Sequence, residues 1–352
     1  MKIAIDISQI VYGTGVSTYT RNLLSSLLSI DRENEYIPFA GAFRRRGEIL
    51  NAFPNSKIFP IPPILADIIW NRLHAFPIEK LIGDIDVLHT SDWTEPPTDA
   101  FKVTTVHDLY PLKFPRMVHT KILEVHRRKL YWVRKEAKRI IVPSLSTKND
   151  LTGLGFDESI IRVIPEAPAL TRPSDEAIAE VKRKYNIRED YLISIGITPL
   201  KNTSRIIKAF RMASVGKDLK LILAGRPNNI KIGPERNVRM LGHIPQADLA
   251  ALLSGSRGLI FASLYEGYGI PILDAFNCGV PVVTSNIASM PEVAGNAAVL
   301  VDPTSTDSIA EGITRIVRGS KGLVDKGNIR IKDFSWEKTA RETLNVYKEA
   351  QQ

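Results

Sequence analysis

Residues 259–271 read Leu-Ile-Phe-Ala-Ser-Leu-Tyr-Glu-Gly-Tyr-Gly-Ile-Pro. The first four side chains form a short apolar run, which is typical of a strand buried in a sheet. Two glycines beside an acidic residue follow, and they allow backbone amides to approach a ligand at the end of that strand. A helix is expected from about Ile272, and its N-terminus would favour a phosphate. The stretch therefore predicts a strand, a ligand-binding turn and a helix.

The same alternation of apolar runs with helical or irregular sequence recurs along the chain. It predicts strands at residues 2–7, 86–89, 102–107, 139–143 and 161–164, and again at 191–196, 219–225, 238–242, 258–262, 280–284 and 298–301. Strands that alternate with helices indicate parallel sheets covered on both faces. The predicted fold class is α/β, with two Rossmann-like doubly wound domains facing a cleft. Ligands of such sheets bind at the carboxyl ends of the strands, so the chemistry is expected in the loops that follow them.

The domain boundary is predicted from a proline-rich segment. Three prolines fall within nine residues at Pro165–Pro173, which disfavours both a helix and a central strand. The resulting domains are residues 1–168 and 169–334, followed by a helix at 335–352 that is expected to pack back on the N-terminal domain. The residues on one face of this helix are Trp336, Ala340, Leu344 and Tyr347.

Length and composition exclude several classes of protein. The chain has 352 residues, which favours two domains at roughly 100 to 200 residues each. A single cysteine, Cys278, rules out an internal disulfide and favours a reducing compartment. Asp6 interrupts the first apolar run, so no secretory signal is expected. The apolar stretches are interrupted before they reach the roughly 18 residues of a spanning helix. The expected location is cytoplasmic.

The net charge of +9 is concentrated in one segment. Residues 113–148 contain eleven Lys and Arg against Glu124 and Glu136, so this segment carries +9 and the remainder of the chain sums to zero. Apolar and aromatic residues lie among these charges, which is a pattern that can bind anionic lipid headgroups. A helix that solvates one face and packs the other is the alternative. Nucleic acid is not an expected partner, because no recognised binding motif accompanies the charge.

Two segments carry a resemblance to a known family. Residues 266–285 read Glu-Gly-Tyr-Gly-Ile-Pro-Ile-Leu-Asp-Ala-Phe-Asn-Cys-Gly-Val-Pro-Val-Val-Thr-Ser, and residues 290–295 read Met-Pro-Glu-Val-Ala-Gly. Together they resemble the donor-binding signature of family 4 glycosyltransferases. Further matches occur in the same order as in that family, at the loop with Gly13 and Gly15, Thr105–Asp108, Gly196 with Lys201 and Asn202, Ala224–Gly225 and Leu241–Ile244. The resemblance implies a GT-B fold and a retaining enzyme that needs no metal or other cofactor.

The resemblance also implies roles for individual residues. Glu266 would contact the transferred sugar, and Asp274, eight residues later, would bind the ribose of the donor. Lys201 would bind the diphosphate, where a fixed cation stabilises the charge that grows as the glycosidic bond breaks. His107 would touch the donor sugar from the N-terminal domain. His107, Glu266 and Lys201 are therefore the predicted catalytic residues. The predicted donor-binding residues are Gly13, Gly15, Gly196, Asn202, Arg205, Gly225, His243, Ile244, Gly267, Tyr268, Gly269, Ile270 and Asp274.

The sequence departs from the family pattern at two places. Asp274 stands where the family usually has glutamate, so we expect ribose binding to be retained with a shifted position. The arginine that normally precedes the diphosphate lysine is absent from residues 196–201. Arg205, four residues after Lys201, would supply the missing guanidinium if residues 202–209 form a helix.

Metal and dinucleotide chemistry are not predicted. Five further histidines occur, at His74, His89, His119, His126 and His243. Their spacing to one another and to carboxylate residues does not match that of a metal site. The chain has no Gly-x-x-x-x-Gly-Lys-Ser/Thr loop, and the Gly13-x-Gly15 pair lacks the third glycine of the dinucleotide fingerprint. NAD and ATP are therefore not favoured.

The predicted function is transfer of a hexose from a nucleotide-diphosphate sugar to a glycan or lipid-linked glycan in surface polysaccharide or glycoconjugate synthesis. Residues 105–111 and 163–168 resemble those of mannosyltransferase-like members, which favours GDP-mannose as donor and places a UDP-hexose second. The two departures from the family pattern leave a non-catalytic sugar-nucleotide-binding module as the alternative. A sugar-nucleotide epimerase fits the Glu266 signature poorly. Peripheral contact with the inner face of the cell membrane is expected through residues 113–148.

Overall fold

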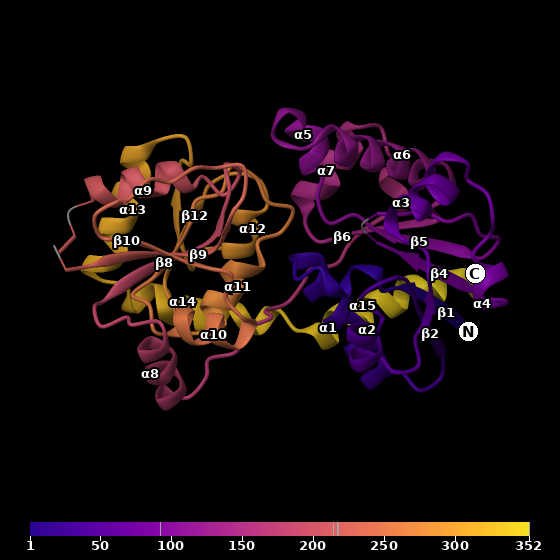
Figure 1. Cartoon of the computed structure of the whole chain (residues 1–352), viewed down its shortest axis with the longest axis horizontal. Coiled ribbons are helices and arrows are strands. Elements are labelled where there is room, and N and C mark those ends of the chain that lie inside the picture. Colours follow the sequence, from indigo (N-terminus) through magenta and orange to yellow (C-terminus); the bar gives the residue numbers. More distant parts are fainter. Residues whose placement is uncertain (92, 214, 217, 352) are drawn as a thin grey trace. The chain divides into compact units, whose positions relative to one another are not determined.

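The computed structural model describes residues 1–91, 93–213, 215–216 and 218–351. The chain forms two compact units, each built around its own parallel sheet with helices on both faces (Figure 1). One unit contains Met1–Glu166 together with Ser335–Gln352, and the other contains Ala167–Phe334. The α/β class and the doubly wound arrangement predicted from the sequence are confirmed.

The N-terminal sheet has the strand order β3-β2-β1-β4-β5-β6-β7, with all neighbours parallel. The strands are β1 (Lys2–Asp6), β2 (Glu35–Gly41), β3 (Lys57–Phe59), β4 (Val87–Thr90), β5 (Phe101–Thr105), β6 (Arg139–Val142) and β7 (Ile161–Val163). The order reverses direction at β1, which is flanked by β2 on one side and β4 on the other, so Ile3 pairs with both Tyr36 and Val87. Such a reversal opens a crevice at the carboxyl ends of the two central strands.

The helices of this unit are α1 (Gly15–Ile30), α2 (Arg46–Ala52), α3 (Pro63–Ala66), α4 (Glu79–Ile82), α5 (Tyr110–Lys113), α6 (Thr120–Glu136), α7 (Leu145–Gly153) and α15 (Trp336–Lys348). Shorter turns are η1 (Ser8–Val11), η2 (Asp67–Arg72, a π-helix), η3 (Pro115–Met117), η4 (Glu158–Ile160) and η6 (Glu349–Gln351). Thr14 caps α1 through a reciprocal pair of hydrogen bonds with Ser17, which explains why the helix begins directly after the glycine turn.

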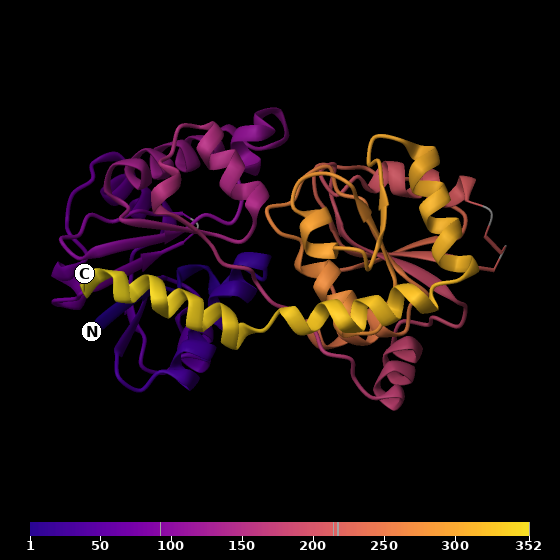
Figure 2. The same cartoon turned by 180° about the vertical axis from the view of Figure 1, so that it is seen from behind.

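The C-terminal helix α15 packs beside α1 of the N-terminal unit (Figure 2). Ser335 caps it by accepting a hydrogen bond from the Lys338 amide. Its buried Tyr347 hydroxyl lies 2.6 Å from Nδ1 of His89, whose Nε2 lies 2.8 Å from Thr105 Oγ1. Burial lowers the pKa of His89 to about 3, so this imidazole is neutral and structural. The predicted return of this helix to the N-terminal domain is confirmed.

The C-terminal sheet has the strand order β10-β9-β8-β11-β12-β13, again entirely parallel. The strands are β8 (Tyr191–Ile197), β9 (Lys220–Pro227), β10 (Val238–Gly242), β11 (Leu259–Phe261), β12 (Val282–Ser285) and β13 (Val299–Val301). Successive side chains of β8 enter opposite apolar layers, because Tyr191 and Ile193 pack on one face and Leu192 on the other. The strand order reverses between β8 and β11, so the crevice of this sheet lies where these two strands end.

The helices of the C-terminal unit are α8 (Asp175–Lys184), α9 (Thr203–Met212), α10 (Gln246–Ser254), α11 (Ile270–Asn277), α12 (Met290–Ala294), α13 (Thr306–Arg318), α14 (Lys321–Arg330) and the turn η5 (Ile331–Asp333). Across the described part of both units, none of the helices has the length and apolar character needed to cross a bilayer.

Candidate active site

Two charged side chains meet at the switch point of the C-terminal sheet. Lys201 lies in the loop after β8, and Glu266 lies in the loop after β11. Lys201 Nζ is 2.6 Å from Glu266 Oε1, and the two side chains are 26% and 14% exposed. The backbone amide of Leu264 donates to the carbonyl of Leu200 at 2.9 Å, so the two loops are joined directly. The sequence places these residues 65 positions apart, and the fold brings them into one ion pair.

The stem of Lys201 lies over a glycine. Gly196 has a φ of +85°, and a Cβ at this position would lie 3.0 Å from Lys201 Cγ. Gly225 in β9 has a φ of +128°, and a Cβ at this position would lie 3.4 Å from the Gly196 Cα. The predicted glycines therefore serve the packing of β8, β9 and the lysine stem. The ammonium group itself lies 4.7 Å from the centre of the Phe261 ring, a cation–π contact.

Asn202 and Arg205 stabilise the loop that contains Lys201 by hydrogen bonds to neighbouring loops. Asn202 is buried in the left-handed conformation, and its Nδ2 donates to the carbonyls of Ala262 (2.9 Å) and Pro303 (2.7 Å). Arg205 donates to Asn202 Oδ1 and to the Pro303 carbonyl at 3.0 Å. These contacts give both side chains a supporting task at the loop. Arg205 lies in the helix on which its predicted contact with the diphosphate depends, and that contact stays a prediction.

The glycine-rich loop that contains Glu266 is fixed by a buried serine. The Ser289 hydroxyl lies 3.0 Å from the Glu266 carbonyl and 2.6 Å from the Tyr268 carbonyl. Gly269 has a φ of +113° at the start of α11, a conformation that strains any residue with a Cβ. Sequence reasoning found the glycines and missed Ser289, because no local pattern links residues that are 21 and 23 positions apart.

Asp274 is directed at the linker. It lies on α11 and is buried, and its Oδ1 accepts hydrogen bonds from the backbone amides of Ala169 (2.7 Å) and Leu170 (2.8 Å). Burial raises the pKa of Asp274 to about 7, against the opposing effect of the two amides. Oδ1 of this carboxylate is therefore engaged by residues 169 and 170, and its contact with a ribose stays a prediction.

Two further predicted residues lie at the end of β10. His243 is exposed and Ile244 is buried in the apolar layer that also contains Tyr268. In the N-terminal unit, Gly13 has a φ of +69° and Gly15 is the first residue of α1, at the switch point between β1 and β4. A Cβ at either glycine would meet no atom within 4 Å, so open space remains above this turn.

His107 follows β5 and is enclosed by three side chains of the N-terminal unit. Nδ1 lies 3.1 Å from Glu166 Oε1, and Nε2 lies 3.0 Å from Ser91 Oγ. Tyr19 meets the imidazole ring edge-on, with the ring centres 4.6 Å apart. The His107 side chain is 12% exposed, so it retains some access to solvent. Sequence reasoning singled out His107 and missed Ser91, Glu166 and Tyr19.

Comparison with known proteins identifies the family. Residues 13–168 match the model of "Glycosyltransferase Family 4", and residues 175–328 match that of "Glycosyl transferases group 1". The chain belongs to glycosyltransferase family 4. The resemblance stated from the sequence motifs is therefore confirmed, and the chain is an enzyme of the glycosyltransferase class.

Several relatives of this glycosyltransferase carry the name of mannosyltransferase. The O-antigen chain mannosyltransferase B of Escherichia coli is 29% identical over 273 residues, which cover 70% of each chain. An MMP α-(1→4)-mannosyltransferase of Mycolicibacterium hassiacum is 31% identical over 62% of this chain and 55% of its own. Among solved structures, HepE of Anabaena in complex with UDP and glucose has a TM-score of 0.74 at 14% identity, covering 99% of this chain and 100% of its own. That likeness supports the fold.

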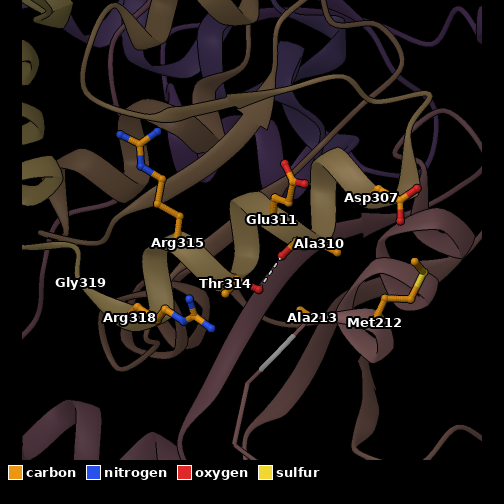
Figure 3. Close-up of a pocket in the computed structure, with 9 residues that line it drawn as sticks. All are labelled: Met212, Ala213, Asp307, Ala310, Glu311, Thr314, Arg315, Arg318 and Gly319. Carbon is orange, nitrogen blue, oxygen red and sulfur yellow. Dashed lines mark hydrogen bonds between the residues drawn. The ribbon is translucent and has the colours of Figure 1, made fainter.

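A pocket of about 790 Å³ lies away from the predicted site of the glycosyltransferase (Figure 3). It opens between the end of α9 and the outer face of α13 and contains none of the predicted donor-binding residues. Its side chains are of mixed charge, with Asp307 and Glu311 beside Arg315 and Arg318. Among the described residues, no cluster of His, Cys, Asp and Glu is suited to hold a metal ion.

The buried carboxyl of Asp274 predicts a pH-dependent stability for the glycosyltransferase. A pKa raised from 3.8 to about 7 means that the folded chain binds more protons than the unfolded chain between these values. Stability therefore falls as the pH rises through this window, by up to about 4 kcal/mol. Asp274→Asn keeps an oxygen acceptor for the two amides and does not titrate. We expect the melting temperature of this variant, relative to wild type, to rise between pH 4 and pH 8. A difference that is constant with pH would contradict the assignment.

Proposed function

We propose that this glycosyltransferase moves a hexose from a nucleotide-diphosphate sugar to a glycan or lipid-linked glycan, with retention of configuration at the anomeric carbon. The observation that carries the proposal is the Lys201–Glu266 pair at the switch point of the C-terminal sheet, where open α/β sheets bind their ligands. Mannose from GDP-mannose is the first choice of donor, because the relatives named above are mannosyltransferases. A UDP-hexose is the second, since the structural neighbour HepE was solved with UDP-glucose.

The proposed chemistry assigns a task to each charged group of the pair. Breaking the glycosidic bond leaves negative charge on the departing diphosphate, and the Lys201 ammonium is placed to stabilise that charge. Glu266 holds the ammonium before the donor binds and then orients the sugar. The partly buried setting strengthens both interactions, because screening by water is reduced. His107 is proposed to contribute from the N-terminal unit.

A panel of nucleotide sugars tests the donor and the reaction. Release of GDP or UDP is measured with and without a chelator, and the anomeric configuration of the product is read by NMR. We expect turnover with GDP-mannose, unaffected by the chelator, and a retained configuration. Binding of a nucleotide sugar without turnover on any acceptor would favour the sugar-nucleotide-binding module, and an inverted product would refute retention.

A surface for an anionic membrane is proposed on the N-terminal unit, where α6 lies beside η2. Arg128 pairs with Asp67 at 2.9 Å, and Trp132 Nε1 donates to the Asn71 carbonyl at 2.8 Å, so the two elements are held together. Arg128 is therefore occupied within the unit and is a poor candidate for the lipid contact predicted from the sequence. Lys129 is also buried. Exposed cations of α6 include Lys121, Arg127, Arg134 and Lys135.

Large apolar side chains are exposed on α3, on η2 and just after it, and η2 packs against α6. Five lie within thirteen residues, at Ile64, Leu65, Ile68, Leu73 and Phe76. Apolar groups that flank a cationic helix suit the boundary between headgroups and acyl chains. This combination supports peripheral contact of the enzyme with the inner face of the cell membrane, beside a lipid-linked acceptor.

Vesicle binding is expected to depend on Leu73. We expect cosedimentation with phosphatidylglycerol vesicles at low salt and much less with phosphatidylcholine vesicles or at high salt. Leu73→Glu should weaken binding about tenfold or more, because burying a leucine side chain contributes roughly 1.5–3 kcal/mol. Ile329→Glu is the matched control, since Ile329 in the C-terminal unit is 68% exposed and Leu73 is 69% exposed. Equal binding of both variants and wild type would remove the membrane proposal.

A further inference from the structure

A serine, a histidine and a carboxylate are aligned at the carboxyl ends of three strands of the N-terminal sheet. Ser91 follows β4, His107 follows β5, and Glu166 follows β7. The Ser91 hydroxyl lies 3.0 Å from His107 Nε2, and Glu166 Oε1 lies 3.1 Å from His107 Nδ1. Ser91 and Glu166 are each only 4% exposed. Glu166 lies within residues 163–168, which resemble mannosyltransferase-like members, but no sequence motif assigns a role to it or to Ser91.

The surroundings of the ring leave it little freedom to turn. Tyr19 contacts it edge-on, and the Tyr19 hydroxyl lies 3.1 Å from Thr105 Oγ1 in the buried interior. Burial raises the pKa of Tyr19, and the negative charge of Glu166 adds to this effect. The phenol is therefore uncharged, and its ring restricts rotation of the His107 side chain by packing against it. His89, whose two nitrogens are satisfied by Tyr347 and Thr105, provides the structural contrast: it is fully buried and has no carboxylate partner.

The partners of His107 decide which of its nitrogens carries the proton. A carboxylate oxygen only accepts hydrogen bonds, so contact with Glu166 requires a proton on Nδ1. In the neutral imidazole, Nε2 is then an acceptor with a free lone pair. The Ser91 hydroxyl can donate to that lone pair. The direction of both hydrogen bonds therefore follows from the single carboxylate.

We propose that Glu166 is a positioning residue that holds His107 in the Nδ1-protonated tautomer and so presents Nε2 as a hydrogen-bond acceptor to a hydroxyl group. In the free protein this hydroxyl is that of Ser91, and in the complex it is a hydroxyl of the sugar substrate. The inference rests on the proposed role of His107 in transfer. It gives a task to a buried carboxylate at the end of the first segment of the N-terminal unit, where burying a charge is costly.

The same three residue types, in this order, also form the nucleophile, base and orienting acid of serine hydrolases. In that arrangement the serine oxygen would itself react, and its removal would abolish the chemistry. Under our proposal Ser91 only occupies Nε2 until a substrate hydroxyl replaces it. Ser91→Ala therefore separates the two, because it should lower the transfer rate by no more than about threefold. Loss of transfer in Ser91→Ala would overturn our assignment.

The tautomer is read by ¹⁵N NMR of the full chain labelled at histidine, with His107→Gln used to assign the His107 signals. We expect the Nδ1-protonated form in wild type and its loss in Glu166→Leu, which removes the acceptor at similar volume. Glu166→Gln keeps an oxygen that can accept from Nδ1, and it should retain the tautomer in part. A wild-type signal of the Nε2-protonated form would overturn the proposal.

Kinetics of the same variants connect the tautomer to transfer. We expect Glu166→Leu to lower kcat by about 10- to 100-fold, as loss of an orienting partner does elsewhere, with the donor KM changed by less than about threefold. Glu166→Gln should recover part of that loss, which a merely structural role would not predict if both variants melt alike. An unchanged kcat in a variant whose tautomer has switched would overturn the proposal. The NMR reading needs no donor, so a failure of the proposed transfer reaction remains distinguishable from a failure of this inference.

Discussion

Replacing Lys201 with alanine is expected to lower kcat by about two to three orders of magnitude, which is the range found when one pre-positioned donor of charge stabilisation is removed from an active site. The ammonium is placed by the Gly196 backbone under its stem, by the Phe261 ring and by Glu266 at 2.6 Å. These contacts hold it in position before any donor binds. Under the proposed function, little reorganisation would then be needed when negative charge develops on the leaving diphosphate.

The matched control for this variant is Lys208→Ala. Lys208 is an exposed lysine on α9, seven residues further along the chain, and its removal changes the net charge by the same amount. Initial rates with the donor identified from the nucleotide-sugar panel, and melting temperatures of both variants, complete the comparison. If Lys201→Ala kept the wild-type rate and donor affinity, the diphosphate site would have to be sought elsewhere.

The fold could be predicted from the sequence because parallel strands covered on both faces are continuous apolar runs. The run at residues 258–262 and the one at 191–196 both became central strands of the C-terminal sheet. β2 was not predicted. It contains Pro38, which cannot donate to the ladder and argues against a strand, yet β2 lies between β1 and β3. Its neighbours Phe39 and Ala40 are almost fully buried, so packing outweighs the lost hydrogen bond.

The candidate site could be predicted only where its residues belong to a local motif. Lys201 and Glu266 each follow a strand with a recognisable turn, and the sheet order then joins them. Glu166 lies 59 residues from His107, and no pattern in the chain announces that contact. Spacing placed Asp274 on the same helix as the signature but could not give the direction of its carboxylate, which faces the linker.

The number of cations in the basic segment likewise did not reveal which of them are exposed. Residues 113–148 carry a net +9 in the sequence. The structure directs Arg128 into a pair with Asp67, 61 residues away, and buries Lys129. The sequence alone could not show that these two cations are unavailable to a ligand, because which face of a helix is buried depends on the elements that pack against it.

Replacing Glu266 with glutamine is expected to lower kcat by about two orders of magnitude while leaving the fold intact. The change removes one charge and keeps the size of the side chain, but it replaces one acceptor oxygen with an NH2 donor. The partner Lys201 loses its counter-ion, and because the pair is only partly exposed we expect some loss of stability, smaller than the roughly 3–5 kcal/mol of breaking a fully buried pair. Transfer suffers more, because the carboxylate is proposed to orient the sugar while the ammonium receives the leaving charge.

A double-mutant cycle shows whether the two residues act on the same step. Groups that act as one unit lose far less together than the sum of their separate losses. We therefore expect the double variant Lys201→Ala/Glu266→Gln to have a kcat close to that of the single variant with the lower kcat. The ion pair seen in the free protein predicts this coupling, since each side chain positions the other. The cycle is measured at saturating donor. Fully additive losses in log kcat would mean that the ion pair exists only in the free enzyme and that the two residues stabilise the transition state independently.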